Sequence, residues 1–428
     1  MNVLVIGGGG REHALIKSLK NSPEITKLYA LPGNGGIAKD AICENIKATD
    51  LDGIVRFATE NNIDYCVVAP DDPLAMGAVD RLNAVNIPCF GPTKAAAEIE
   101  GSKVFAKHLM EKYNIPTASC HVFDDMEKAL AHLDTAPIPT VIKADGLALG
   151  KGVSICFTQD EAKTAIRQMM QEKIFGDSGR RIVVEEFLEG PEVSVLCFTD
   201  GHTLRPMVSS MDHKRAHDGD LGSNTGGMGT IAPNPYYTDA IAKQCMAEIF
   251  MPTIEGMKAE GRPFKGCLYF GLMLTKDGPK VIEYNCRFGD PETQVVLPLL
   301  KSDLFKILRA VSNEKLDQVD VTFFDGSACC VVLASGGYPG AYERGKIIAL
   351  NGADALNGVA IYHSGTALDA DGNFITAGGR VLGVSATDAD LKSAIDRAYD
   401  AANRIDFEGA FMRKDIGHSA LALGKVEA

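Results

Sequence analysis

The chain has 428 residues, a formal net charge of −13, and 46% hydrophobic and 23% charged residues. Two to four domains of roughly 100–200 residues fit this length, and the composition is that of an ordinary globular protein. The acidic balance argues against a broad nucleic-acid-binding face, although it permits a local basic pocket. No stretch approaches the roughly 20 apolar residues of a membrane span. The chain start lacks the basic region of a signal peptide, and the cysteines form no C-x-x-C pair, so we expect a reduced, cytoplasmic protein without zinc.

The first hundred residues alternate between strand and helix patterns. The predicted strands are short apolar runs at residues 3–6, 28–31, 65–69 and 87–90. The predicted helices between them, from the spacing of apolar residues, lie at residues 11–19 and 54–59. Because strands that alternate with helices indicate a parallel sheet covered on both faces, we expect a Rossmann-like N-terminal α/β domain over residues 1–101.

From Gly101 onward the pattern changes to many short strands with fewer helices. The predicted helices lie at residues 102–110, 159–172, 237–259 and 304–311. The predicted strands lie at residues 140–144, 153–156, 181–185, 193–199, 266–275 and 280–285. Residues 211–235 are rich in Gly, Asp and Asn and show no periodicity, so we expect a long segment without regular structure, which is usually functional.

The end of the chain, from about Asp325, is again rich in strands. The predicted strands lie at residues 328–334, 360–364 and 380–387, and a predicted helix follows at 388–405. This pattern indicates a separate small α+β domain over residues 325–428. The expected fold class is therefore a multidomain α/β and α+β protein.

A run of four glycines, Gly7–Gly10, follows the first predicted strand and precedes the first helix. Glycine lets backbone N–H groups approach a phosphate at a helix N-terminus. A dinucleotide site is disfavoured, because Glu12 takes the third glycine position of G-x-G-x-x-G and no acidic residue ends the second strand. Two interpretations remain: a tight turn without a ligand, or a site for a phosphate-bearing substrate, to which Gly33–Gly36 could contribute from the same sheet edge.

A second glycine-rich loop, Asp145–Val153, lies between two predicted strands. It contains Lys151 but is not a Walker A motif, because no G-K-[ST] opens a helix. Such a hairpin is either a plain turn or a lid that folds over a triphosphate. Lys143 and Lys103 could neutralise phosphate charge at one site, although an isolated lysine is usually a solvated surface charge.

Glu283 and Asn285 are candidate metal ligands. Their two-residue spacing in a predicted strand points both side chains to one face. A carboxylate and an amide oxygen suit Mg²⁺, which takes further ligands from water and phosphates, whereas the alternative is an ordinary polar strand face. The acidic segment 185–192 could contact adenine and ribose, Arg287 could pair with a carboxylate or phosphate, and residues 224–229 form a further glycine loop. Together these features predict a phosphoryl-transfer site.

Several of these segments resemble the signature segments of one family. They lie at residues 7–14, 101–103, 143–153, 185–192, 212–215, 224–229 and 287–294. The combination N-T-G-G-M-G with R-F-G-D-P-E-T-Q is similar to that of glycinamide ribonucleotide synthetase, also called phosphoribosylamine–glycine ligase, of the ATP-grasp superfamily. The resemblance covers essentially the whole chain. It implies a central ATP-grasp domain over residues 102–324, with a mobile lid subdomain at about 120–190.

The resemblance also implies roles for the matching residues. Those implied to contact ATP are Lys103, Lys143, Gly146, Gly150, Lys151, Gly152, Glu185, Glu186, Leu188 and Glu192. Those implied to bind Mg²⁺ or Mn²⁺ are Glu283 and Asn285. Those implied in catalysis are Lys143, Asp212, Lys214 and Arg287. Those implied to bind the other substrates are Gly8, Gly9, Gly10, Asn34, Asp71, Asn224, Thr225, Gly226, Gly227, Arg287, Gly289, Asp290 and Pro291.

The implied reaction joins glycine to 5-phosphoribosylamine through glycyl phosphate and yields glycinamide ribonucleotide, ADP and phosphate, a step of de novo purine biosynthesis. The alternatives are another ATP-grasp carboxylate–amine ligase or carboxylase, a non-catalytic nucleotide-binding regulator, and a dehydrogenase. Two residues depart from the family pattern, since Asp71 stands where the family has Glu and Met211 where Gln is usual. These departures bear on substrate affinity more than on the reaction class. We expect a monomer or a weak homodimer.

Overall fold

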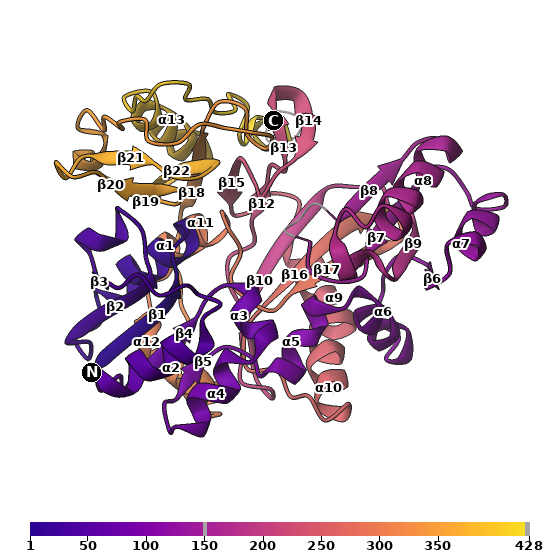
Figure 1. Ribbon diagram of the computed structural model, residues 1–428, viewed down its shortest axis with the longest axis horizontal. Helices are drawn as coiled ribbons and strands as arrows, with labels where there is room; N and C mark the ends of the chain where they lie inside the picture. Colours follow the sequence, from indigo (N-terminus) through magenta and orange to yellow (C-terminus); the bar gives the residue numbers. More distant parts are fainter. Residues whose placement is uncertain (149–151, 424–428) are drawn as a thin grey trace.

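The computed structural model describes residues 1–148 and 152–423 (Figure 1). The predicted Gly150 and Lys151 contacts therefore lie outside the described residues. Within the described part of the chain, no helix has the length and apolar character needed to span a bilayer.

The N-terminal hundred residues form a five-stranded parallel sheet in the order β3-β2-β1-β4-β5. The strands are β1 (Asn2–Gly7), β2 (Lys27–Pro32), β3 (Ile42–Cys43), β4 (Tyr65–Val68) and β5 (Cys89–Phe90). The helices are α1 (Gly10–Leu19), α2 (Leu51–Glu60), α3 (Asp71–Met76), α4 (Ala78–Ala84) and α5 (Lys94–Gly101). The parallel sheet predicted from the sequence is confirmed, and β3 escaped prediction because two residues carry no readable pattern.

Both faces of this sheet are buried, as a parallel sheet requires. Val3 and Val5 of β1 pack in one apolar cluster with Leu15 of α1, whereas Leu4 and Ile6 pack in another. The strand order reverses between β1 and β4, which are neighbours although β2 and β3 lie between them in the chain. Ligands of open α/β sheets bind beyond the carboxyl ends of the strands at such a switch point. The glycine run after β1 and the segment after β4 lie there.

The central region contains two antiparallel sheets of four strands each. The first has the order β6 (Cys120–Phe123), β9 (Ile182–Glu186), β7 (Thr140–Ala144) and β8 (Val153–Cys156). The second has the order β11 (Leu204–Pro206), β10 (Glu192–Thr199), β16 (Gly266–Thr275) and β17 (Gly278–Asn285). The helices of this region are α6 (Lys103–Lys112), α7 (Met126–Leu133), α8 (Gln159–Ile166), α9 (Asp239–Cys245), α10 (Met251–Ala259), α11 (Thr293–Leu299) and α12 (Leu304–Ser312).

The segment 211–235 is not devoid of regular structure, so that expectation was wrong. It contains β12 (Met211–Asp212), β13 (Arg215–His217), β14 (Leu221–Asn224) and β15 (Gly229–Ala232). These strands have two to four residues, too few to show an alternating pattern. β15 pairs with β18 (Ser327–Ala334), about a hundred residues further along the chain, so long-range pairing rather than local sequence stabilises it.

The C-terminal sheet has the order β12-β15-β18-β22-β19, so the central part of the chain contributes two of its strands. Its other elements are β19 (Val359–His363), β22 (Arg380–Asp388), the hairpin β20 (Thr366–Leu368) and β21 (Phe374–Thr376), α13 (Leu391–Ala402) and α14 (His418–Leu423). Figure 1 shows this sheet over the carboxyl edge of the N-terminal sheet, with α1 and α11 between them. Met211 packs against the apolar cluster of this sheet, so its side chain adds to the core there.

Candidate functional site

Lys143 lies where the two central sheets meet. It is a buried residue of β7, and its Nζ lies 2.9 Å from Glu185 Oε2 of β9. The same Nζ donates a 2.9 Å hydrogen bond to the carbonyl of Ile282 in β17. Lys107 of α6, which the sequence did not single out, lies 3.3 Å from Glu185 Oε1. That buried oxygen accepts no aligned hydrogen bond from residues 1–148 and 152–423, so it can still accept one from a ligand.

The glycine loop after β7 is held to the start of α6 by Asp145. Its Oδ1 accepts hydrogen bonds from Ser102 Oγ at 2.8 Å and from the Val104 N–H at 2.9 Å. Its Oδ2 lies 2.6 Å from an Arg181 nitrogen. Ser102 caps α6, and Lys103 Nζ donates to the Gly146 carbonyl at 3.2 Å. The hairpin predicted around this loop is confirmed by the pairing of β7 with β8, and the entrance of the loop is a fixed structure.

Glycine is needed at both described ends of this loop. A Cβ on Gly146 would lie 2.5 Å from Ser178 Oγ, and one on Gly152 would lie 2.7 Å from the Ala148 Cβ. Contacts this short do not occur, so any larger residue would move the loop. The close packing keeps backbone groups of the loop beside Lys103 and Lys143.

Glu283 and Asn285 share one face of β17. Glu283 pairs with Gly271 and Val281 with Leu272, so Ile282 is the extra residue of a β-bulge. Bulges re-aim side chains near active sites. Tyr284, between the two candidates, is buried against Thr253 on the opposite face.

The Glu283 carboxylate is surrounded by what we call the cation cluster, which consists of Lys214, Lys143, Lys103 and Arg287. Burial by itself raises the pKa of Glu283, but these four cations outweigh burial and hold it below its ordinary value. Burial also lowers the pKa of Lys103. The cluster offers four cations to a polyanion, although three of them also pair with other carboxylates: Lys143 with Glu185, Lys214 with Glu192 and Arg287 with Glu100.

A metal ion at Glu283 and Asn285 would need ligands from elsewhere. No group of three His, Cys, Asp or Glu side chains suited to a metal occurs in residues 1–148 and 152–423. One carboxylate and one amide oxygen nevertheless match a hard cation that completes its shell with water and phosphate oxygens. Asn285 Oδ1 already accepts a 3.1 Å hydrogen bond from Arg287 Nη2, which fixes its orientation. The donor set therefore fits Mg²⁺ or Mn²⁺ bound together with a nucleotide.

The acidic residues of segment 185–192 contact two different parts of the site. Glu186 accepts hydrogen bonds from the Ser119 N–H at 3.2 Å and from Lys280 Nζ at 3.1 Å. Leu188 is half-buried in the connection to β10. Glu192, at the start of β10, lies 2.5 Å from Lys214 Nζ. Glu192 and Glu283 together raise the pKa of Lys214 well above its ordinary value, although burial opposes this. Lys214 is thus the link between the predicted nucleotide residues and the segment around Asp212.

Arg287 connects the metal face to the N-terminal part of the chain. Its Nη2 lies 3.2 Å from Glu100 Oε1, and its Nη1 donates to the Phe288 carbonyl at 3.3 Å. Its Nε is buried without a hydrogen-bond partner among the described residues. Asp71, at the start of α3, is close enough to raise the pKa of Arg287 together with Glu100. The unpartnered N–H can donate to an anionic substrate group.

Asp212 is buried beside the last glycine loop. Its Oδ1 has no hydrogen-bond partner in the described chain. Burial raises the pKa of Asp212 well above its ordinary range, and the nearby Glu292 raises it further. Gly227 has φ +106°, and a Cβ there would lie 2.6 Å from Asp212 Oδ1 and 2.4 Å from Pro291 Cδ. Only glycine fits between these two groups.

The loop 224–229 is anchored to Lys214 and to the C-terminal sheet. Both the N–H and the Oγ1 of Thr225 donate 2.8 Å hydrogen bonds to the Lys214 carbonyl, and Asn224 ends β14 opposite Arg215. Arg380 of β22 donates to the carbonyls of Gly226 and Gly227. No motif or spacing in the sequence pointed to Arg380.

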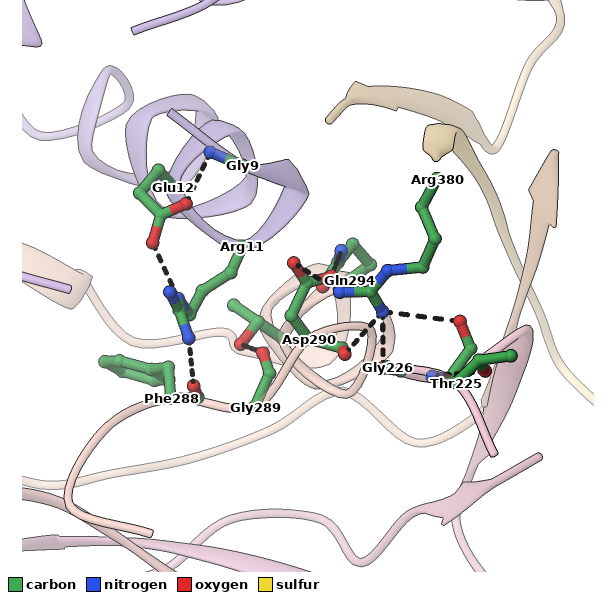
Figure 2. A network of polar contacts seen from close by, with 12 residues as sticks. Gly9, Arg11, Glu12, Thr225, Gly226, Phe288, Gly289, Asp290, Gln294 and Arg380 are labelled. Carbon is green, nitrogen blue, oxygen red and sulfur yellow. Dashed lines mark hydrogen bonds and ion pairs between the residues drawn. The ribbon is translucent and has the colours of Figure 1, made fainter. Parts of the chain in front are cut away.

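Figure 2 shows how the turn Gly289–Pro291 meets the N-terminal glycine run. Arg11 Nη1 donates to the Phe288 carbonyl at 3.1 Å, and Arg11 Nε lies 2.6 Å from Glu12 Oε1. Glu12 Oε2 accepts the Gly9 N–H at 2.6 Å. A Cβ on Gly10 would lie 2.7 Å from Gln294 Nε2, which itself donates to Asp290 Oδ1 at 2.6 Å. The two segments therefore pack directly against each other.

Asn34 joins the second N-terminal glycine loop to the first. Its Nδ2 donates to the Gly8 carbonyl at 2.9 Å and to the His363 carbonyl of β19 at 2.7 Å. A Cβ on Gly8 would lie 2.4 Å from the Gly33 carbonyl oxygen. Three parts of the chain meet here, and all of them face the carboxyl edge of the N-terminal sheet.

The structure thus assembles two neighbouring groups of the predicted residues. One contains the lysines, Glu185 and the metal candidates, and the other contains the glycine run, Asn34, the 224–227 loop and the Asp290 turn. Lys214 and Arg287 lie between them. The sequence reasoning gave no role to Lys107, Asp145, Glu292 or Arg380, although Asp145 and Glu292 lie in segments that it singled out.

Comparisons with known proteins agree over the whole chain. The family models for phosphoribosylglycinamide synthetase match in three parts: the N domain at residues 1–100, the ATP-grasp (A) domain at 101–293 and the C domain at 328–419. A phosphoribosylamine–glycine ligase of Yersinia pestis is 46% identical over 428 residues, covering 99% of this chain and 100% of the relative. One of Clostridium acetobutylicum is 46% identical over 419 residues, covering 98% and 100%.

Solved structures give the same result for the fold. The crystal structure of phosphoribosylamine–glycine ligase from Thermotoga maritima superposes with a TM-score of 0.85 at 32% identity, covering 97% of this chain and 100% of that one. The biotin carboxylase domain of Hydrogenobacter thermophilus 2-oxoglutarate carboxylase, at 16% identity and a TM-score of 0.75, shares the fold over 96% of this chain and 91% of its own. The chain belongs to the phosphoribosylglycinamide synthetase family, with an N domain, an ATP-grasp domain and a C domain.

Proposed function

We propose that the chain is an ATP-dependent carbon–nitrogen ligase that joins glycine to 5-phosphoribosylamine in de novo purine biosynthesis. Two findings support this function. Relatives named phosphoribosylamine–glycine ligase match the full length of the chain, and the cation cluster faces the Glu283 carboxylate. The cluster carries the proposal, because phosphoryl transfer is achieved mainly by positioning and by neutralising phosphate charge.

The reaction proceeds in two steps. A glycine carboxylate oxygen attacks the γ-phosphorus of ATP, the bond to the β-phosphate oxygen breaks, and glycyl phosphate and ADP form. The amine of phosphoribosylamine then attacks the glycyl carbonyl, the bond to the phosphate oxygen breaks, and inorganic phosphate leaves as the amine loses a proton. Phosphorylation is needed because a free carboxylate offers no adequate leaving group.

The nucleotide residues act by binding and by excluding water. Lys103 and Lys143 contact the ATP phosphates, and the glycine loop that begins at Gly146 covers them; the contacts predicted for Gly150 and Lys151 lie outside the described residues. Glu185 Oε1, which lies beside Lys107, and the connection through Glu186 and Leu188 receive the adenine, and Glu192 receives the ribose. Fixed cations at the phosphates stabilise the transferring charge without reorganisation at the moment of reaction.

Glu283 and Asn285 hold Mg²⁺ or Mn²⁺ in this proposal. When bound, the ion supplies charge neutralisation at the phosphate oxygens. Arg287 keeps the Asn285 amide oriented, and the cation cluster keeps Glu283 ionised. Both effects keep the two oxygen donors ready for the ion.

The second group of residues binds the remaining substrates. Asp212, Lys214 and Arg287 contact glycine and the acyl phosphate, with the loop of Asn224, Thr225, Gly226 and Gly227 beside them. Phosphoribosylamine occupies the carboxyl edge of the N-terminal sheet; the residues that contact it are Gly8, Gly9, Gly10, Asn34, Asp71, Gly289, Asp290 and Pro291. The position of these segments at the topological switch point supports this assignment.

The proposed domain limits are 1–101, 102–324 with the lid at about 120–190, and 325–428. The pairing of β15 with β18 means that the central domain contributes strands to the C-terminal sheet. That the protein is a monomer or a weak homodimer and works in the cytoplasm stays a prediction.

The test is release of ADP and phosphate from MgATP, with glycine or freshly generated phosphoribosylamine omitted in turn. Release that requires both substrates supports the ligase. Release with a different carboxylate or amine would replace the named substrates by those of another ATP-grasp enzyme. Tight ATP binding without release under any of these conditions would contradict catalysis and favour a nucleotide-binding regulator.

A further inference from the structure

Arg380 is the point at which the C-terminal sheet contacts both substrate loops. Its Nη1 donates to the Asp290 carbonyl at 2.8 Å, to the Gly227 carbonyl at 3.3 Å and to the Gly226 carbonyl. Its Nη2 lies 3.3 Å from Asp290 Oδ2. Figure 2 shows the guanidinium between the Gly226 loop and the Asp290 turn. One side chain therefore fixes two segments that have no strand or helix in common.

The position of Arg380 is itself tightly constrained. Arg380 begins its pairing with β18 opposite Ala334, where the register shifts. A Cβ on the preceding Gly379 would lie 2.2 Å from Tyr338 Cδ2, so the backbone there packs against an aromatic ring. The hydroxyl of the same Tyr338 accepts the Gly226 N–H at 3.1 Å. The C-terminal segment thus holds Gly226 from both its N–H and its carbonyl.

Other hydrogen bonds hold the flanks of the two segments, such as Gly227 N–H to Thr225 Oγ1 at 3.0 Å and Gln294 Nε2 to Asp290 Oδ1 at 2.6 Å, whereas Arg380 bonds the carbonyls of Gly226 and Gly227. Gly226 and Gly227 lack side chains, and Gly227 has φ +106°. Glycine pairs lose more conformational entropy on ordering than other residues, so they order only where outside contacts fix them. Arg380 supplies such contacts while Gly227 lies against Asp212 and Pro291.

We infer that Arg380 is a positioning residue that holds the Asn224–Gly227 loop and the Gly289–Pro291 turn in the spacing needed to bind glycine and phosphoribosylamine. It acts through these two segments, and the ATP cradle around Lys143 does not depend on it, because that cradle is built from β7, β9 and β17. This inference rests on the proposed function for its substrates. Its structural part, the ordering of two loops by one guanidinium, stands independently of it.

The experiment compares Arg380→Ala and Arg380→Lys with wild type and with a matched control. Arg397→Ala is the control, because Arg397 makes contacts of the same kind at the opposite end of β22. It donates to the Asn357 carbonyl at 2.8 Å and to the Asp388 carboxylate. Three quantities are measured: the Kd for ATP, the kcat/KM for glycine and for phosphoribosylamine, and hydrogen exchange of the backbone.

For Arg380→Ala we expect kcat/KM for glycine and phosphoribosylamine to fall roughly ten- to a hundredfold, because several hydrogen bonds of a charged donor are lost. The Kd for ATP should stay within about twofold, since no contact in the ATP cradle changes. Exchange should accelerate in residues 224–229 and 289–292 and stay unchanged in 140–148. Arg380→Lys should recover part of the loss, because one ammonium reaches fewer acceptors than a guanidinium. Arg397→Ala should match wild type in all three.

Two results would overturn the inference. One is an Arg380→Ala protein whose kcat/KM values equal those of wild type. The other is a loss spread equally over ATP affinity and exchange throughout the chain, which would mean a general structural role. If wild type itself turns over no substrate, the proposed function fails, but the local exchange comparison still decides whether Arg380 orders the two loops.

Discussion

Replacing Glu283 by Gln tests the proposed metal site most directly, because the change keeps the shape of the side chain and removes its charge. Glu283 is the carboxylate that faces Lys214, Lys143, Lys103 and Arg287. Its loss removes the charged ligand of the ion but leaves a more positive pocket. We therefore expect metal binding and metal-free nucleotide binding to change in opposite directions.

The expected loss in turnover is large. If the ion neutralises several kcal/mol of transition-state charge, the variant should lose about 4 kcal/mol, or roughly 10³-fold in kcat. The apparent metal concentration for half-maximal activity should rise, because an amide oxygen binds Mg²⁺ more weakly than a carboxylate. Metal-free ATP should bind as tightly as before or more tightly, since the four cations are no longer partly neutralised.

The assay is ADP release under saturating glycine and phosphoribosylamine, repeated over a titration of Mg²⁺ and of Mn²⁺, with ATP affinity measured separately in chelator. Glu260→Gln is the control, because Glu260, directly after α10, pairs at 2.6 Å with the exposed Lys112. The control should keep wild-type turnover. Turnover of Glu283→Gln within tenfold of wild type at saturating metal, or weaker binding of metal-free ATP, would refute the assignment of Glu283.

Three further predictions concern loops and pH. Gly227→Ala should lower kcat/KM for glycine at least about tenfold and leave the ATP affinity intact, because a strained φ and a clash with Pro291 move the loop. Activity equal to that of wild type would contradict the tight packing. Asp145→Asn should weaken ATP binding about tenfold by freeing the lid from α6 and Arg181, which calorimetry measures, and unchanged affinity would argue against the anchor. Burial lowers the pKa of His213 to about 4 from an ordinary 6.5, so between pH 6.5 and 4 the unfolded chain binds a proton at His213 that the folded chain does not. As the pH falls from 6.5 to 4, the free energy of unfolding should then decrease by up to roughly 1.4 kcal/mol per pH unit because of His213. Urea unfolding of His213→Asn should show a smaller decrease over this range. An equal decrease in the variant would exclude His213 as its cause.

Local pattern was sufficient for much of the fold. The strands of the N-terminal sheet are short apolar runs bounded by turn residues, and their alternation with helices gave the parallel arrangement. β16 was predicted at its observed limits, because ten residues of apolar pattern end in a turn at Gly278. The helix α11 was missed, since nearly all of its residues are buried and Pro298 lies within it, so it shows no polar face.

The same distinction between local pattern and tertiary contact applies to the residues of the candidate site. Glu283 and Asn285 could be paired from sequence because strand geometry puts residues two apart on one face, and the bulge at Ile282 did not disturb that relation. Lys143 and the acidic segment that begins at Glu185 were candidates from their own sequence context, but their pairing could not be predicted, since the 2.9 Å contact depends on two strands meeting. Met211 departs from the family pattern in a way expected to bear on substrate affinity, whereas its side chain packs against the C-terminal core.

The sequence by itself determined the α/β character of the first domain, the loops that carry glycine and the shared strand face of Glu283 and Asn285, the candidate metal ligands, because each depends on residues within a few positions of one another. Only the tertiary structure decided that Arg380 contacts Asp290, 90 residues away, and Gly226, 154 residues away. It also decided that β15 joins the C-terminal sheet. Such contacts have no local signature, because they form only when distant segments bury their apolar faces together and bring their polar groups within hydrogen-bonding distance.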